Sequence, residues 1–126
     1  MTSINDLVSG VINRIDSIPS SITGSPIIYE LLNDARIDVQ NILDVSIGES
    51  DVAEKYQPII KNIGAAYTLS RMTGIGVDFD YSLGNFRVSK SSSGDPDAKQ
   101  LQFFIDQANR SINGIGRTIP YKATFQ

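Results

Sequence analysis

The chain has 126 residues, of which 40% are hydrophobic and 20% are charged, and it contains neither cysteine nor histidine. This length and composition are typical of one soluble globular domain, and they exclude disulfides, thiolate metal sites and a Ser-His-Asp triad. The formal net charge of −3 argues against gripping DNA, because non-specific DNA affinity depends mainly on Lys and Arg. No window is long and apolar enough to cross a bilayer, and the N-terminus lacks a signal-peptide pattern, so we expect a cytosolic product with no membrane partner.

Two amphipathic helices are predicted in the first third of the chain. Residues 2–17 have apolar side chains at helical spacing, with Thr2 or Ser3 as the cap and Pro19 marking the exit. Ser25 followed by Pro26 begins a second helix, which should run to about Asp44. The expected buried faces are Ile4, Leu7, Val8, Val11, Ile12 and Ile15 in the first helix, and Ile28, Leu31, Leu32, Ala35, Val39, Ile42 and Leu43 in the second.

A third helix contains a proline that leaves its start open. Pro58 is too far inside a helix begun at Val52 to be harmless, so the helix either kinks there or begins near Tyr56. Gly64, followed by two alanines, predicts a notch where a neighbouring helix approaches closely. The expected buried stripe is Tyr56, Ile59, Ile60, Ile63, Ala66, Tyr67 and Leu69.

Two short segments then alternate apolar and polar residues at the strand period of two. They are residues 77–81 and 86–89, and the Gly/Asn turn between them predicts a hairpin. Residues 90–94 are too polar to pack and should form a surface loop.

The last predicted helix begins at Asp95 and Pro96 and ends around Gly114 or Gly116. Its apolar stripe is Leu101, Phe104, Ile105, Ala108 and Ile112. The predicted fold is therefore all-α: a four-helix bundle over residues 1–116, with a hairpin-like insertion at 73–94 and an extended C-terminal arm at 117–126. The apolar groups of the arm either fold back over their own bundle or dock in a partner.

None of the patterns that could carry chemistry is convincing. Asp78 and Asp80 lie on one face of a strand, where a solvated edge explains them better than a metal site. The Gly-Ile-Gly segments at 74–76 and 114–116 follow helices, which favours helix termination over a phosphate cradle. A platform that stacks single-stranded nucleic acid would rest on six scattered residues: Phe86, Arg87, Lys90, Arg117, Tyr121 and Lys122. We expect no catalytic residue, no metal and no cofactor.

Three segments together suggest a family. They are Ser70-Arg71-Met72 at the end of the third helix, Tyr81-Ser82-Leu83-Gly84-Asn85-Phe86-Arg87-Val88-Ser89 in the hairpin, and Ile115-Gly116-Arg117 after the last helix. This pattern resembles the head-tail adaptor (connector) proteins of long-tailed bacteriophages and related viruses, and the likeness covers most of the chain.

The resemblance implies a structural role in the virion, without covalent chemistry. It implies a homo-oligomeric ring, expected to have twelve copies and assembled in the host cytoplasm, that joins the portal protein to the next neck or tail-completion protein. DNA would pass through the ring without specific binding. The implied channel or ring-to-ring segment contains Asp78, Asp80, Tyr81, Leu83, Phe86, Arg87 and Val88. The implied docking arm contains Arg117, Thr118, Ile119, Pro120, Tyr121, Lys122 and Phe125.

The charge of the hairpin agrees with such a channel, because Asp78 and Asp80 repeated around a ring would repel the phosphates of passing DNA. Two alternatives stay open. One is another neck or tail-completion protein of the same virion. The other is a small helical binding or regulatory module, whose best DNA-reading helix, residues 98–110, has only Lys99 and Arg110 as basic residues.

Overall fold

The computed structural model describes residues 2–15, 26–80, 85–88 and 96–115. These residues are mostly helical, with four α-helices and one two-stranded antiparallel sheet between the third and fourth of them. The elements in chain order are η1 (Asn5–Leu7), α1 (Val8–Arg14), α3 (Ile27–Leu43), η2 (Glu54–Tyr56), α4 (Gln57–Thr73), β1 (Val77–Asp80), β2 (Asn85–Val88) and α5 (Pro96–Ile115). A helix thus lies in each of the four predicted places, and an antiparallel pair of strands lies where the hairpin was expected. The turn at 81–84, the predicted loop at 90–94 and the arm at 117–126 lie outside the described residues.

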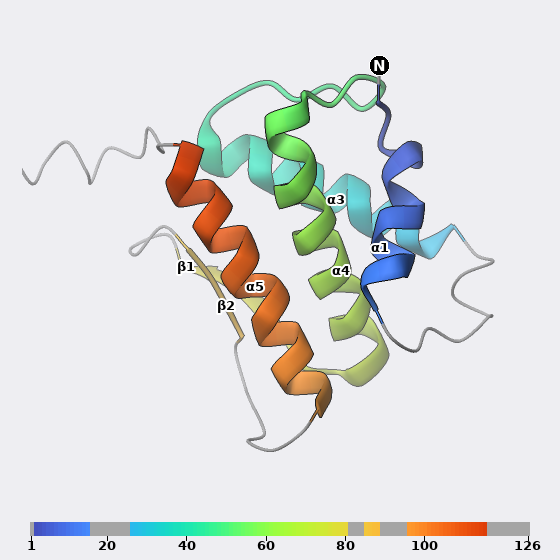
Figure 1. Cartoon of the computed structure of the whole chain (residues 1–126), viewed down its shortest axis with the longest axis vertical. Coiled ribbons are helices and arrows are strands. Elements are labelled where there is room, and N and C mark those ends of the chain that lie inside the picture. The colour runs from blue at the N-terminus through green and yellow to red at the C-terminus, as the bar shows by residue number, and fades with distance from the viewer. Residues whose placement is uncertain (1, 16–25, 81–84, 89–95, 116–126) are drawn as a thin grey trace, which may run out of the picture.

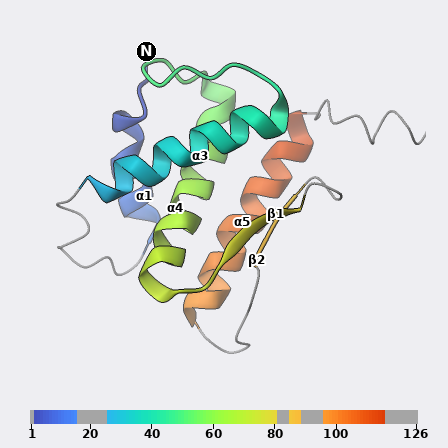
Figure 2. The ribbon, with the colours of Figure 1, turned by 180° about the vertical axis from the view of Figure 1, so that it is seen from behind.

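Helix α4 is the centre of the molecule. It packs against α5, α3 and α1, and it also contacts β1. In Figure 1, α4 lies between α1 and α5, and α3 crosses behind it; Figure 2, turned by 180°, shows α3 in the foreground. This position explains why nearly all the middle of α4 is buried, including Ile59, Ile60, Ile63, Ala65, Ala66 and Leu69.

The first helix begins with a tighter turn than predicted. The Ser3 hydroxyl accepts a hydrogen bond from the Asp6 N–H at 3.3 Å, and the Asp6 carboxylate accepts one from the Ser3 N–H at 2.8 Å. The Asp6 N–H is shared with the Ser3 carbonyl at 3.0 Å, whereas the Ser3 N–H gains its acceptor from the Asp6 carboxylate. The side chain of Ser3 thus caps this helix start, as predicted. The predicted extent of 2–17 is wrong, because a 3₁₀ turn precedes α1 and Ile15 is already extended, with φ −102° and ψ 125°.

Pro58 neither kinks nor breaks a helix. It lies in the first turn of α4, where its missing N–H would have had no helical partner. Of the two predicted starts, the one near Tyr56 is therefore correct. The short 3₁₀ turn η2 precedes it, and Gly74 ends the helix in the left-handed region at φ 79°.

The predicted notch at Gly64 is the crossing point of α3 and α4. A Cβ placed on Gly64 would lie 2.6 Å from Leu32 Cδ2 and 3.1 Å from Leu32 Cγ. A residue with a Cβ at this position would clash with Leu32, so the two helices can pack this closely only with a glycine here. Leu31, which was predicted to share the buried face with Leu32, is only half-buried.

The two strands pair antiparallel, and Asn85, which the sequence placed in the turn, is already part of β2. Val77 lies opposite Val88, Asp78 opposite Arg87, Phe79 opposite Phe86 and Asp80 opposite Asn85. The rings of Phe79 and Phe86 meet edge to face, with 4.9 Å between their centroids. The sheet contacts both α4 and α5, and its apolar face extends the helical core.

No helix among residues 2–15, 26–80, 85–88 and 96–115 has both the length and the apolar content that crossing a membrane requires.

Candidate interaction surfaces

The hairpin has one buried face and one exposed face. Phe86 is 2% exposed and belongs to the core, and Val77, Phe79 and Val88 are partly buried against it. Asp78 and Arg87 are exposed and lie opposite each other in the register. Of the residues predicted to form a channel or ring-to-ring segment, only these two have described side chains that are fully available to a neighbour.

Two members of that predicted segment lie on the inner face of the sheet. The ring of Phe86 is enclosed by the core. Val88 is half-buried, on the same face of the sheet. The reason is that an alternating strand necessarily turns every second side chain inward, so a whole hairpin cannot be surface.

A single side chain from α5 fixes the hairpin to the helices. The Phe86 N–H donates to Asn109 Oδ1 at 2.8 Å, and Asn109 Nδ2 donates to the Phe86 carbonyl at 2.9 Å. The amide of Asn109 thus bonds to β2 as the backbone of a third strand would. Sequence reasoning missed this residue, although a carboxamide directly beside the apolar stripe of a helix is a signal for such a contact.

The acidic character of the exposed face is smaller than the sequence suggests. Arg87 lies across from Asp78, and a cation therefore accompanies the acid on the same face. Asp80 is paired with Asn85 in the sheet. Any band of negative charge formed by these strands would include the guanidinium of Arg87.

The other predicted site residues cannot be placed. Tyr81 and Leu83 of the hairpin turn lie outside the described residues, and so does every residue of the predicted docking arm: Arg117, Thr118, Ile119, Pro120, Tyr121, Lys122 and Phe125.

A polar contact lies between α1 and α4. Arg14 Nε donates to the buried Asn62 Oδ1 at 3.3 Å, and its terminal NH1 donates to the Gly10 carbonyl at 3.1 Å. Burial lowers the pKa of the Arg14 guanidinium below its ordinary value, because the charged form loses part of its hydration. The bond to Asn62 joins α1 to α4, and the bond to Gly10 lies within α1.

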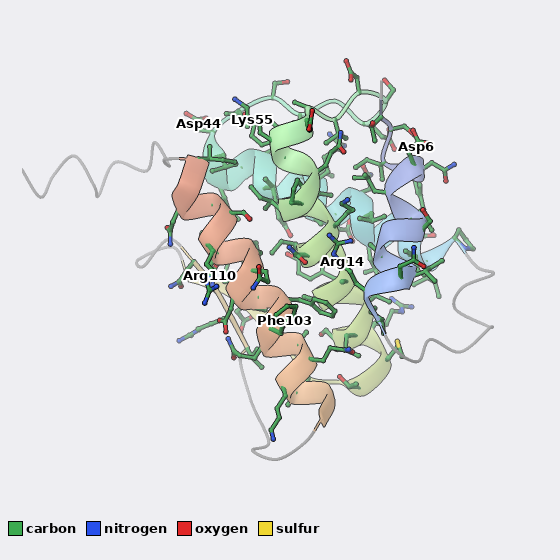
Figure 3. All side chains as sticks on the ribbon, in the orientation of Figure 1. Asp6, Arg14, Asp44, Lys55, Phe103 and Arg110 are labelled. Carbon is green, nitrogen blue, oxygen red and sulfur yellow. The ribbon has the colours of Figure 1, made fainter. Side chains whose placement is uncertain are left out.

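Two large apolar side chains stand out on the surface of the described residues. Ile37 of α3 is 38% exposed and Phe103 of α5 is 56% exposed. Phe103, labelled in Figure 3, lies on the side of the molecule opposite to α3. Neither residue is predicted to have a role from the sequence alone, because each is a lone apolar residue on the polar face of a helix.

Within 2–15, 26–80, 85–88 and 96–115, no three acidic side chains form a group that could hold a metal ion. Comparisons of the chain with protein-family models, with curated proteins and with solved structures found no match.

Proposed function

We propose that this chain is a structural subunit of a head-tail adaptor ring in a tailed virus. In this proposal a four-helix bundle, repeated in twelve copies, binds beneath the portal protein, meets the next neck or tail-completion protein, and extends the DNA channel without gripping DNA. The ring assembles in the host cytoplasm and remains in the virion. The proposal takes its family from the resemblance in the hairpin and helix-end segments.

One observation of the described structure supports this role most directly. The hairpin is anchored through Phe86 and Asn109 to α5, while Asp78 and Arg87 project from its outer face. A short sheet held rigidly beside two long helices presents a fixed polar surface, which is what a subunit needs when it contacts neighbours by shape. Arg14 and Asn62 are polar groups at least partly buried, as catalytic groups often are, but they bond to each other and so have a structural role.

The remaining parts of the proposal concern residues 117–126. Arg117 and Lys122 are the only charged residues of this segment, and Ile119, Tyr121 and Phe125 are its large apolar ones. We assign it to docking on the portal, since basic and aromatic groups are enriched in protein interfaces.

Electron microscopy of the purified chain mixed with portal protein tests the proposal. We expect rings bound to one end of the portal, and loss of binding when residues 119–126 are deleted. Attachment of the truncated chain to portal at wild-type affinity would refute the role of this segment in docking. A chain that remains monomeric or dimeric at every concentration, with and without portal, would refute the ring and favour the small regulatory module.

The proposed channel role of the acids has a separate test. Asp78→Asn combined with Asp80→Asn should leave the ring intact but change retention or release of packaged DNA. Unchanged DNA retention and release in particles carrying both substitutions would contradict it.

A further inference from the structure

The exposed sides of α3 and α5 have the same residue spacing. On α3 the exposed residues Glu30, Asp34, Ile37 and Asn41 recur at steps of four, three and four, and the exposed Asp44 follows as the C-cap residue. On α5 the exposed residues Lys99, Phe103, Asp106, Arg110 and Asn113 follow the same steps. Such steps place the residues along one straight stripe of a helix. Each stripe contains one large exposed apolar residue, Ile37 on α3 and Phe103 on α5.

The two stripes are opposite in charge. The α3 stripe contains the acids Glu30 and Asp34 and no basic residue, and Asp44 adds a third acid just beyond its C-terminal end. The α5 stripe contains Lys99 and Arg110 against Asp106, and that carboxylate already accepts a hydrogen bond from Gln102 at 2.9 Å. An α3 stripe therefore repels its own copy and attracts an α5 stripe.

The stripes also lie on opposite sides of the molecule. α3 crosses α4 on the side that faces the viewer in Figure 2, and α5 with Phe103 lies on the side that faces the viewer in Figures 1 and 3. Two complementary patches on opposite sides produce a head-to-tail contact, in which each subunit uses one patch for each neighbour. Such a contact closes into a ring when the rotation per subunit divides a full turn.

We infer that the outer stripe of α3 binds the outer stripe of α5 in a second copy of this chain, with Ile37 and Phe103 at the centre of the contact. This inference rests on the proposed ring and names its subunit interface. Lone exposed apolar residues are common on protein surfaces. Here, however, Ile37 belongs to a stripe whose charged residues are all acids, and Phe103 belongs to a stripe with two basic residues and one acid. This difference in net charge selects another copy as the partner.

Charge reversal of one stripe at a time tests the pairing. The first variant is Glu30→Lys with Asp34→Lys, and the second is Lys99→Glu with Arg110→Glu. Each variant then has two stripes of the same sign, so we expect the concentration needed for assembly to rise about tenfold or more, by sedimentation velocity with portal present. In an equimolar mixture the reversed α3 stripe meets the reversed α5 stripe, and assembly should return to near the wild-type concentration.

A matched control for the first variant is Asp51→Lys with Glu54→Lys, which makes the same change in net charge at exposed positions outside both helices. It should assemble like the wild type. A single chain with all four stripe reversals provides the second measurement, because it should again assemble by itself.

The outcomes separate the interface from the function. Reversed variants that assemble as well as the wild type would overturn the interface while leaving the ring in place. Variants that fail singly and are not restored by mixing would show that the two stripes do not meet each other, which also overturns the pairing. A wild-type chain that forms no ring with portal would overturn the proposed function itself.

Discussion

Replacing Asn109 with alanine tests how the hairpin is held. The substitution removes both hydrogen bonds to Phe86, of 2.8 and 2.9 Å, and leaves a half-buried N–H and C=O without this partner. A hydrogen bond contributes about 1 kcal/mol, and stranded groups add to the cost, so the gross loss is about 2–3 kcal/mol. The better helix propensity of alanine returns about 0.5 kcal/mol. The expected net loss in unfolding free energy is therefore about 2 kcal/mol.

Urea denaturation measures this loss, and hydrogen exchange at the Phe86 amide locates it. The control Asn113→Ala changes the same residue type at an exposed position of α5, and it should alter stability by less than about 0.5 kcal/mol. Asn109→Asp keeps an acceptor for the Phe86 N–H but loses the donor to its carbonyl, so it should also destabilise. Equal stability of Asn109→Ala and the wild type, with an unchanged hydrogen-exchange rate at the Phe86 amide, would show that the Asn109 hydrogen bonds do not hold the hairpin.

Three further predictions concern helix packing and capping. Gly64→Ala should destabilise by about 1 kcal/mol in thermal unfolding, because overpacking against the buried Leu32 exceeds the gain in helix propensity; a more stable variant would contradict the close approach. Gly114→Ala, where a Cβ meets nothing within 4 Å, should instead stabilise by about 0.5 kcal/mol, and a loss would show that this end of α5 is packed. Hydrogen bonds from the Ser3 N–H and hydroxyl hold the pKa of Asp6 below its ordinary value of 3.8, so its contribution to stability is complete above that pH and is lost as the pH falls through the lowered pKa. The difference in unfolding free energy between the wild type and Asp6→Ala should therefore shrink toward zero in acid titration, and a difference that grows on acidification would be inconsistent with this sign.

Residue patterns were sufficient for the long helices and the hairpin. Apolar residues recur at helical spacing along α3, α4 and α5 with few polar residues among them. A proline in the first turn also marks the beginning of both α4 and α5. Alternation at period two likewise predicted the two short strands, because only one face of the sheet can enter the core.

The features that depend on tertiary contact could not be predicted in this way. Periodicity does not tell which helix a hairpin packs against, and so the hydrogen bonds between Asn109 of α5 and Phe86 of β2 were not predicted. The 3₁₀ turn before α1 was missed for a related reason, since its geometry follows from the Ser3 and Asp6 hydrogen bonds rather than from apolar spacing. The sequence also does not show that the outer stripes of α3 and α5 lie on opposite sides of the molecule, because this depends on how the helices pack.

The start of the chain is joined to the connection between α3 and α4. The Ile4 N–H donates to the Glu49 carbonyl at 2.9 Å, and the Val52 N–H donates to the Thr2 carbonyl at 2.6 Å. These bonds close a loop that contains both α1 and α3, and closing a long loop costs chain entropy before any contact repays it. α1 should therefore dock late in folding, after α3 and α4 have crossed at Gly64, and it should be among the first elements to detach when the protein opens.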